Sequence, residues 1–213
     1  MIRLTKGKKP DVLERNAAAW AKELADKIAS NEEPSKYLLS RYSHADIKKA
    51  LLAETNEKCA YCESPLRHVT YGDIEHIIPK ALDPASRFTW ENLTIACDVC
   101  NTNKSNIPDL VDPYTCEPST LFMFYGPLMW ADPAVQSAVL TEEQLDLNRN
   151  GLVERRKERI EFLRNLIASA SSKREDIRDA MVRRAEREVD VDRPYSACGK
   201  AILVQLRLMH QIP

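Results

Sequence analysis

The stretch that decides the fold begins with Cys59-Ala-Tyr-Cys62 and ends with Cys97-Asp-Val-Cys100. A CxxC turn presents two thiolates on one side of a tight loop, and two such turns complete a tetrahedral sulfur cage for Zn²⁺. Because four thiolates close the coordination sphere, we expect the zinc ion to be structural. Binding of this kind stabilises a small module by about 10 kcal/mol.

A disulfide framework is the alternative reading of these four cysteines. Nothing at the N-terminus resembles a signal peptide, and a reducing cytosol favours metal binding over disulfides. We therefore expect a zinc site in a cytoplasmic protein. The two other cysteines, Cys116 and Cys198, have no partner at ligand spacing, and we expect them to be ordinary, partly buried residues.

The segment between the two repeats carries polar residues that suit catalysis. Residues 73–78 predict a short strand ending at Pro79, and a helix is expected to begin at Asn101, directly after the second repeat. This arrangement would bring Glu75, His76 and Asn101 within a few ångströms of one another. Carboxylate and amide oxygens suit Mg²⁺ or Mn²⁺, and an imidazole can take a proton from water near neutral pH. The set predicts metal-assisted hydrolysis of a phosphodiester.

Residues 59–104 resemble an HNH endonuclease domain of the ββα-metal type, in the subgroup with a four-cysteine zinc site. Besides the cysteines, the motif residues are the Glu75-His76 pair, Asn92 in Trp-Glu-Asn-Leu, and Asn101 after the second repeat. The resemblance implies that His76 is the general base. It implies that Asn92 braces the loop that carries this base.

The same resemblance implies a metal site and a mechanism. Glu75 and Asn101 match the residues that hold a single Mg²⁺ or Mn²⁺ ion, and Lys104 matches a helix lysine that can meet a phosphate. Asp is commoner than Glu at position 75, so Asp73 is an alternative ligand. His76 would take a proton from water, which attacks phosphorus in line and leaves 5′-phosphate and 3′-hydroxyl ends.

The whole chain predicts an α+β fold, with a ββα-metal HNH core and a structural four-cysteine zinc site embedded in mainly α-helical N- and C-terminal extensions. We expect an N-terminal helical segment, a nuclease core with the zinc site, and a mainly helical C-terminal region at residues 1–56, 57–110 and 111–213. Apolar residues at helical spacing predict helices, two of them capped by Asp11 and Ser43. The helices are expected at residues 11–30, 44–55, 154–169 and 195–210, and an extended segment at 121–125. The last helix is apolar nearly all round, which predicts burial within the domain or against another protein.

The composition shows no surplus of positive charge. Of 213 residues, 44% are hydrophobic and 30% are charged, and the formal net charge is −1. A chain that binds DNA strongly by itself usually has a basic surplus. The charge therefore predicts either a locally basic cleft or a partner that contributes to DNA binding. No apolar run approaches the roughly 20 residues of a membrane helix, so no membrane partner is expected.

The resemblance extends past the catalytic motif to one subfamily, the PtuB nuclease subunits of Septu-type and retron-associated anti-phage systems. The resemblance lies in residues 1–10, 47–51, 58–63, 71–80, 145–149 and 152–156. In that family the nuclease assembles with an ABC-type ATPase, PtuA. The resemblance implies a DNA endonuclease that serves as the effector of an anti-phage defence system together with such an ATPase.

Two alternatives to a defence effector stay open. A stand-alone restriction or homing-type HNH nuclease would cleave specific sequences alone and would carry a DNA-reading module, which we do not find in the sequence. A non-catalytic zinc-finger module that binds nucleic acid would be favoured by the loss of Glu75, His76 or Asn101. All three residues are present, which favours a nuclease.

Overall fold

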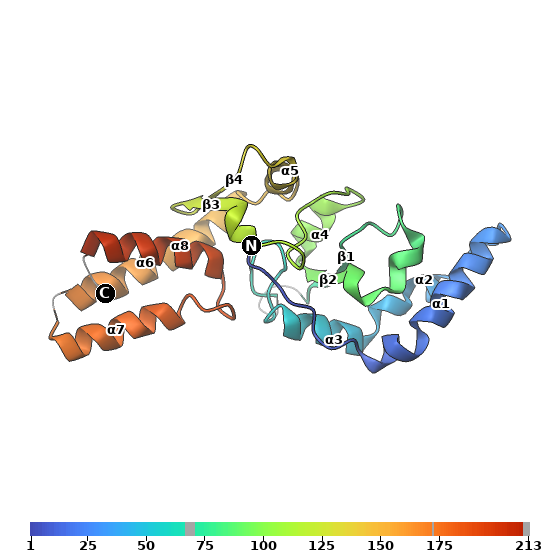
Figure 1. Ribbon diagram of the computed structural model, residues 1–213, viewed down its shortest axis with the longest axis horizontal. Coiled ribbons are helices and arrows are strands. Elements are labelled where there is room, and N and C mark those ends of the chain that lie inside the picture. The colour runs from blue at the N-terminus through green and yellow to red at the C-terminus, as the bar shows by residue number, and fades with distance from the viewer. Residues whose placement is uncertain (67–70, 172, 211–213) are drawn as a thin grey trace.

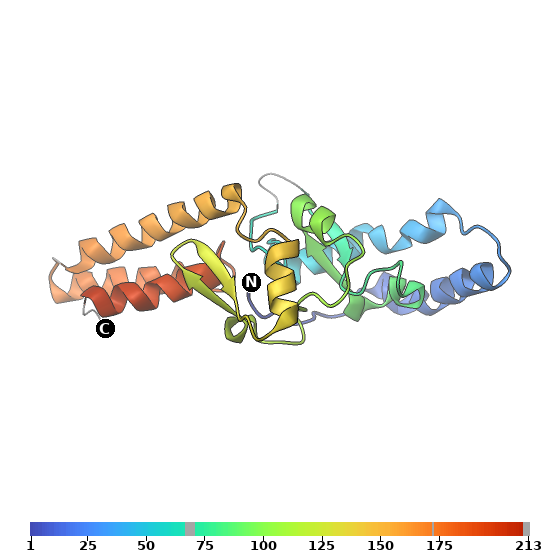
Figure 2. The same cartoon turned by 90° about the horizontal axis from the view of Figure 1, so that it is seen from above.

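The computed structural model describes residues 1–66, 71–171 and 173–210. They form an elongated molecule, with helix α1 at one end, a three-helix unit at the other, and a small ββα unit between them (Figure 1 and Figure 2). Helices predominate, and two small antiparallel sheets complete the fold. The predicted α+β class with a four-cysteine cluster is confirmed.

The ββα unit consists of strands β1 and β2 and helix α4. The two strands pair antiparallel, with Glu75 opposite Thr94 and His76 opposite Leu93. Helix α4 follows β2 and contacts β1. The bounds are Asp73–His76 for β1, Leu93–Ala96 for β2 and Asp98–Lys104 for α4. Short 3-10 turns, η2 (Pro84–Phe88) and η3 (Trp90–Asn92), connect the two strands.

Two sequence predictions for this unit need correction. Strand β1 ends at His76 instead of Ile78, because the chain turns there and Ile77 bonds through its N–H to the Asn92 carbonyl (2.9 Å). Helix α4 begins at Asp98 and not at Asn101. The Asn101 N–H already donates to the Cys97 carbonyl (2.9 Å), so the second CxxC repeat forms the first turn of the helix.

Three helices and a 3-10 turn precede the ββα unit. Helix α1 spans almost the predicted range, but Pro10 is its N-cap and Asp11 its first residue, where a carboxylate favours the positive end of the helix dipole. Helix α3 is capped by the His44 side chain, which accepts from the Asp46 N–H (3.2 Å), and not by Ser43. The bounds are Asp11–Ala29 for α1, Lys36–Ser40 for α2, Arg41–Ser43 for η1 and Ala45–Glu54 for α3.

The C-terminal half begins with a hairpin and continues as helices. Strand β3 lies within the predicted extended segment, without Leu121, and pairs with β4, which leaves Met123, Tyr125, Leu128 and Trp130 exposed on one face. Helices α6, α7 and α8 pack together beyond helix α5 (Figure 1). The bounds are Pro118–Thr120 for η4, Phe122–Tyr125 for β3, Leu128–Ala131 for β4, Gln136–Gln144 for α5, Asn150–Ser171 for α6, Glu175–Arg187 for α7 and Ser196–His210 for α8.

Helix α8 is not buried on all sides. Ile202, Leu203 and Leu206 are buried against the neighbouring helices, whereas Val204 and Leu208 are exposed. The helix has apolar residues around most of its circumference, and the neighbouring helices cover only one of its faces. The large hydrophobic core nevertheless contains residues from Met1 to Leu206, so it runs through all three predicted segments. The division at 1–56, 57–110 and 111–213 stays a prediction.

In the part of the chain that the structure describes, every helix is too short or too polar to span a bilayer.

Candidate functional site

The four cysteines of the two CxxC repeats form one cluster in the core. Their sulfur atoms all lie within 4.8 Å of one another, and all four residues are buried. The first repeat is held by the Cys59 N–H, which donates to the Ser64 carbonyl (2.9 Å), and the second by its place in α4. This cluster can hold a metal ion. A closed set of four sulfur donors fits a tetrahedral zinc site.

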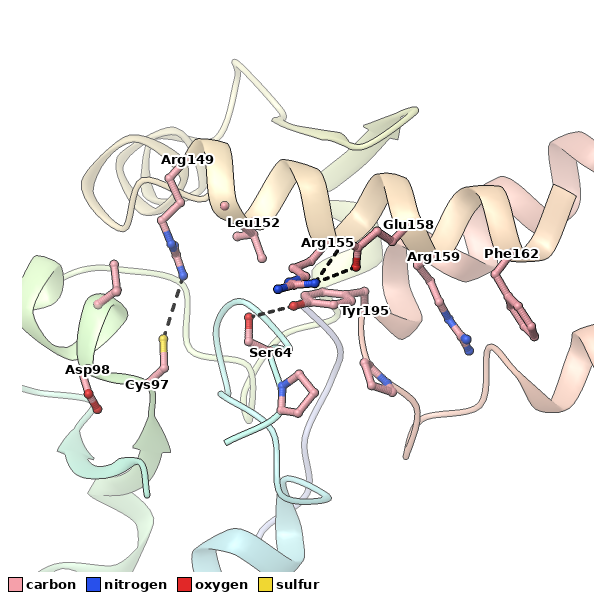
Figure 3. Close-up of a pocket in the computed structure, with 14 residues that line it drawn as sticks. Ser64, Cys97, Asp98, Arg149, Leu152, Arg155, Glu158, Arg159, Phe162 and Tyr195 are labelled. Carbon is pink, nitrogen blue, oxygen red and sulfur yellow. Dashed lines mark hydrogen bonds and ion pairs between the residues drawn. The ribbon is translucent and has the colours of Figure 1, made fainter. Parts of the chain in front are cut away.

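The guanidinium group of Arg149 reaches this cluster from the start of α6. Its Nη2 atom lies 3.9 Å from Cys97 Sγ (Figure 3). The same atom lies 3.8 Å from Cys100 Sγ. A donor at this position compensates the negative charge of thiolates. The contact therefore connects the C-terminal half of the chain to the cysteine cluster.

Glu75, His76 and Asn101 line one small pocket, and the sequence analysis expected these three residues to lie close together. The cavity has a volume of about 170 Å³ and is also lined by Pro79, Lys80, Ser105 and Asn106. Strand β1 supplies the first two residues, helix α4 supplies Asn101, and the loops after these elements supply the rest. The ββα unit thus gathers the three residues although Asn101 lies 26 positions after Glu75 in the sequence.

His76 is buried and lines this pocket. Its Nε2 lies 3.0 Å from the Arg87 carbonyl oxygen, and since a carbonyl only accepts, Nε2 carries the hydrogen. The Nδ1 lone pair is consequently the one available to a substrate. Burial lowers the pKa of His76 to about 4, so the ring is neutral at neutral pH. The Tyr42 ring packs against it nearly at right angles (82°), with ring centroids 4.6 Å apart.

Asn92 connects the two ends of the loop that follows His76. Its Oδ1 accepts from the Ile78 N–H (2.7 Å), and its Nδ2 donates to the Ile78 carbonyl (3.0 Å) and to Ser86 Oγ (2.9 Å). The Asn92 side chain is buried, whereas its partner Ile78 is half exposed. This position agrees with a bracing role for Asn92.

Glu75 is paired with the lysine of helix α4. Lys104 Nζ lies 3.1 Å from Glu75 Oε1, and the lysine is only 1% exposed. Burial raises the pKa of Glu75, and the Lys104 ammonium acts against this rise. Lys104 therefore contacts the predicted catalytic carboxylate and is neither a surface lysine nor open to a phosphate in this structure.

Asn101 lies beside the other acidic residue of β1. Its Nδ2 donates to Asp73 Oδ2 (3.1 Å), which leaves the Asn101 Oδ1 as the atom available to a cation. Together with the Glu75 carboxylate, this amide oxygen forms a donor set that fits Mg²⁺ or Mn²⁺. Asp73 itself is exposed and lies at the edge of the same group, which keeps it an alternative ligand.

Two residues of the site were missed by sequence reasoning. Lys80 lines the pocket, and Tyr42 contacts both Lys80 and His76. Lys80 lies a few positions after the motif residues Glu75-His76, and this closeness in the sequence could have indicated that it belongs to the site. Tyr42 lies in η1, more than 30 residues before the motif, and only the fold brings it to the site.

A larger cavity, of about 600 Å³, lies elsewhere in the molecule. It is enclosed by α6, by the residues that follow the first CxxC repeat and by the start of α4 (Figure 3). Its arginines are already engaged: Arg149 with the thiolates, Arg155 with Glu158 (2.9 Å) and Arg159 with Glu188 (2.9 Å). The cavity contains none of the predicted catalytic residues. The smaller pocket, which these residues line, is therefore the candidate active site.

Comparison with known proteins agrees with this geometry. Residues 59–106 match the family model of the HNH endonucleases, so this part of the chain is an HNH endonuclease domain. The chain is also similar to the Septu protein PtuB of Bacillus thuringiensis, with 37% identity over 78 residues, or 34% of this chain and 30% of that protein. The Septu protein PtuB of Bacillus mycoides (strain KBAB4) is 28% identical over 123 residues, or 50% of this chain and 42% of that protein. The matched regions thus span less than half the length of these relatives.

Proposed function

We propose that this chain is a metal-dependent endonuclease that hydrolyses DNA phosphodiester bonds with His76 as the general base. The observation that carries the proposal is the bond between His76 Nε2 and the Arg87 carbonyl. It fixes the tautomer in which Nδ1 is the basic atom, within a pocket that Glu75 and Asn101 also line. The match of residues 59–106 to HNH endonucleases supports the same chemistry.

In the proposed reaction, His76 Nδ1 takes a proton from a water molecule as its oxygen attacks phosphorus. The Arg87 carbonyl stabilises the imidazolium that forms, because it continues to accept from Nε2–H. The bond from phosphorus to the 3′ oxygen breaks, and this oxygen takes a proton from solvent, which leaves a 5′ phosphate and a 3′ hydroxyl. Glu75 and Asn101 would hold a single Mg²⁺ or Mn²⁺ ion. When bound, this ion supplies stabilisation of the negative charge on the phosphate and the departing oxygen.

The other assigned residues have supporting roles. Asn92 holds the loop after the base, and Lys104 neutralises the Glu75 carboxylate when no other cation does so. A structural Zn²⁺ ion held by Cys59, Cys62, Cys97 and Cys100 would fix the start of α4 against the loop that carries the first CxxC repeat.

At the level of the cell, the proposed enzyme is the cytoplasmic effector of an anti-phage system and works with an ABC-type ATPase of the PtuA kind. The similarity to Septu proteins PtuB supports this assignment. The net charge of −1 supports it as well, because a chain without a basic surplus benefits from a partner that binds DNA.

Plasmid cleavage with Mg²⁺ or Mn²⁺ tests the mechanism. Wild type and His76→Ala are compared at equal zinc content, beside His44→Ala, whose histidine caps α3 outside the pocket. We expect nicked or linear plasmid from wild type and His44→Ala, and a rate reduced about 10²- to 10⁴-fold in His76→Ala. If wild type alone is inactive, the comparison is repeated with the ATPase partner present. Equal cleavage by the His76 variant would refute the assigned base.

A further inference from the structure

Lys80 has the position of a substrate-binding residue in the proposed active site. It lines the same 170 Å³ pocket as Glu75, His76 and Asn101, and its side chain is half-buried. Among the described residues that line this pocket, Lys80 contributes the cationic side chain. A phosphodiester that reaches His76 therefore meets a positive charge beside the base.

Tyr42 holds this lysine in place. Lys80 Nζ donates to Tyr42 Oη at 3.0 Å and lies 5.1 Å from the centre of the Tyr42 ring. The same ring packs edge-on against His76. One tyrosine thus sets the position of both the base and the cation. This restriction lowers the entropy cost of fixing a long lysine side chain on a phosphate.

Lys104 cannot provide the same contact in this arrangement. Its ammonium is buried and lies against Glu75, whereas Lys80 is bound through a neutral phenol and keeps two further donor hydrogens. An ammonium held by a neutral partner retains its full charge for a phosphate. The cation available to substrate is consequently on the loop after β1.

On the basis of the function proposed above, we propose that Lys80, positioned by Tyr42, binds a nonbridging phosphate oxygen of the nucleic-acid backbone next to His76. The ligand class is a phosphodiester, recognised by charge and not by base sequence. Lys80 then contributes to DNA binding as a point charge, and Tyr42 is a positioning residue that acts through it.

Salt dependence of DNA binding tests the contact separately from catalysis. The background is His76→Ala, which we expect to bind without cutting, and the probe is a fluorescein-labelled duplex of about 20 base pairs, followed by anisotropy between about 50 and 200 mM KCl. Loss of one phosphate contact lowers the slope of log K against log salt by about 0.9. We expect this reduction and a several-fold weaker affinity for Lys80→Met. We expect Lys80→Arg to retain both values.

Two further variants complete the design. Lys157→Met removes an exposed lysine of α6, a helix well separated from β1 in both views, and should change neither slope nor affinity (Figure 1 and Figure 2). Tyr42→Phe keeps the ring against His76 but removes the hydroxyl that holds Lys80. In a cleaving background it should raise KM about threefold with kcat nearly unchanged, and Tyr37→Phe, at an exposed tyrosine, should alter neither.

The outcomes separate this inference from the proposed function. If wild type cleaves DNA and Lys80→Met changes neither the salt slope nor KM, the phosphate contact is wrong and the nuclease assignment stands. If the slope falls by about one unit although wild type cleaves no DNA even with the ATPase partner present, the contact stands and the proposed reaction is what fails.

Discussion

At the scale of single residues, Asn92 shows how a buried amide can fix an active-site loop. It satisfies both backbone groups of Ile78 and also donates to Ser86, so one side chain ties together the start and the end of the turn after the base. Removal of this amide breaks three hydrogen bonds at a site that is only part-buried, because Ile78 is half exposed. Each lost bond costs about 1 kcal/mol.

We therefore predict that Asn92→Ala lowers the free energy of unfolding by about 2–4 kcal/mol. The measurement is urea denaturation of the zinc-loaded protein. Asn16→Ala serves as the control, since Asn16 lies on α1 and its side chain bonds only to its own helix (Asn16 Nδ2 to the Val12 carbonyl, 2.8 Å). That variant should change stability by less than about 0.5 kcal/mol. Equal losses in the two variants would contradict the bracing role.

That Glu75, His76 and Asn101 would lie together was predictable from the sequence, but their partners were not. The three residues could be named from their chemistry and from the resemblance to HNH nucleases, and the structure places them around one pocket, while their catalytic roles stay a prediction. The burial of Lys104 against Glu75 was not foreseen, because both residues look like surface charges in a sequence. Their pairing depends on the packing of α4 on β1, which local patterns do not specify.

At the scale of elements, the segment before α6 connects three parts of the fold. Asn148 bonds to both the N–H and the carbonyl of Met129 in β4 (2.9 and 2.7 Å), and Arg149 reaches the cysteine cluster. Arg156, in the second turn of α6, is 2% exposed and donates to the Leu147 carbonyl (2.9 Å). Sequence reasoning singled out residues 145–149 and 152–156 only by resemblance. The structure supplies the physical reason, since their polar groups satisfy buried acceptors.

Arg149 should slow the loss of zinc from the cluster. We predict that Arg149→Met releases zinc several-fold faster than wild type to a chromophoric chelator, because the thiolates lose a donor that lowers their basicity and screens their charge. Arg149→Lys should lie between the two, since an ammonium keeps the charge without the planar donor pair.

Arg155→Met is the matched control for this experiment. Arg155 lines the same large cavity as Arg149 but pairs with Glu158 on the surface of α6. Its release rate should equal that of wild type. Equal rates for Arg149→Met and wild type would show that the guanidinium contacts do not protect the cluster.

Elements with strong periodicity were predicted well, and those built from long-range contacts were not. Helices α1, α3 and α8 lie within a few residues of their predicted ranges, because their apolar residues recur at helical spacing. Strand β4 was missed, since Leu128–Ala131 gains its identity by pairing with β3. The start of α4 was misplaced because a cysteine repeat carries no ordinary helix signal.

At the scale of the whole molecule, the large hydrophobic core joins all three predicted segments. Leu13 and Leu51 from the first, Trp90 from the second, and Leu152 from the third belong to the same cluster of buried side chains. A core shared in this way favours a single cooperative transition on unfolding. Independent domains would each have their own core.

The three tryptophans allow a direct test. Trp20, Trp90 and Trp130 lie one in each predicted segment, so three variants that each keep a single tryptophan report the segments separately. We predict that, within each variant, tryptophan fluorescence and far-ultraviolet circular dichroism give the same urea midpoint. In the variant that keeps Trp130, the urea midpoint from fluorescence could differ clearly from the midpoint from circular dichroism. That result would establish the C-terminal region as an independent unit.

The exposed face of the β3–β4 hairpin affects the colloidal behaviour of the protein. Tyr125 and Trp130 meet edge-on there with ring centroids 6.0 Å apart, and Met123 and Leu128 extend the same adhesive surface. A sequence isoelectric point of about 6.5 leaves little repulsion between copies near neutral pH. Copies in concentrated solution will therefore adhere through this face, and mildly alkaline buffers, which add negative charge to every copy, will keep them dispersed.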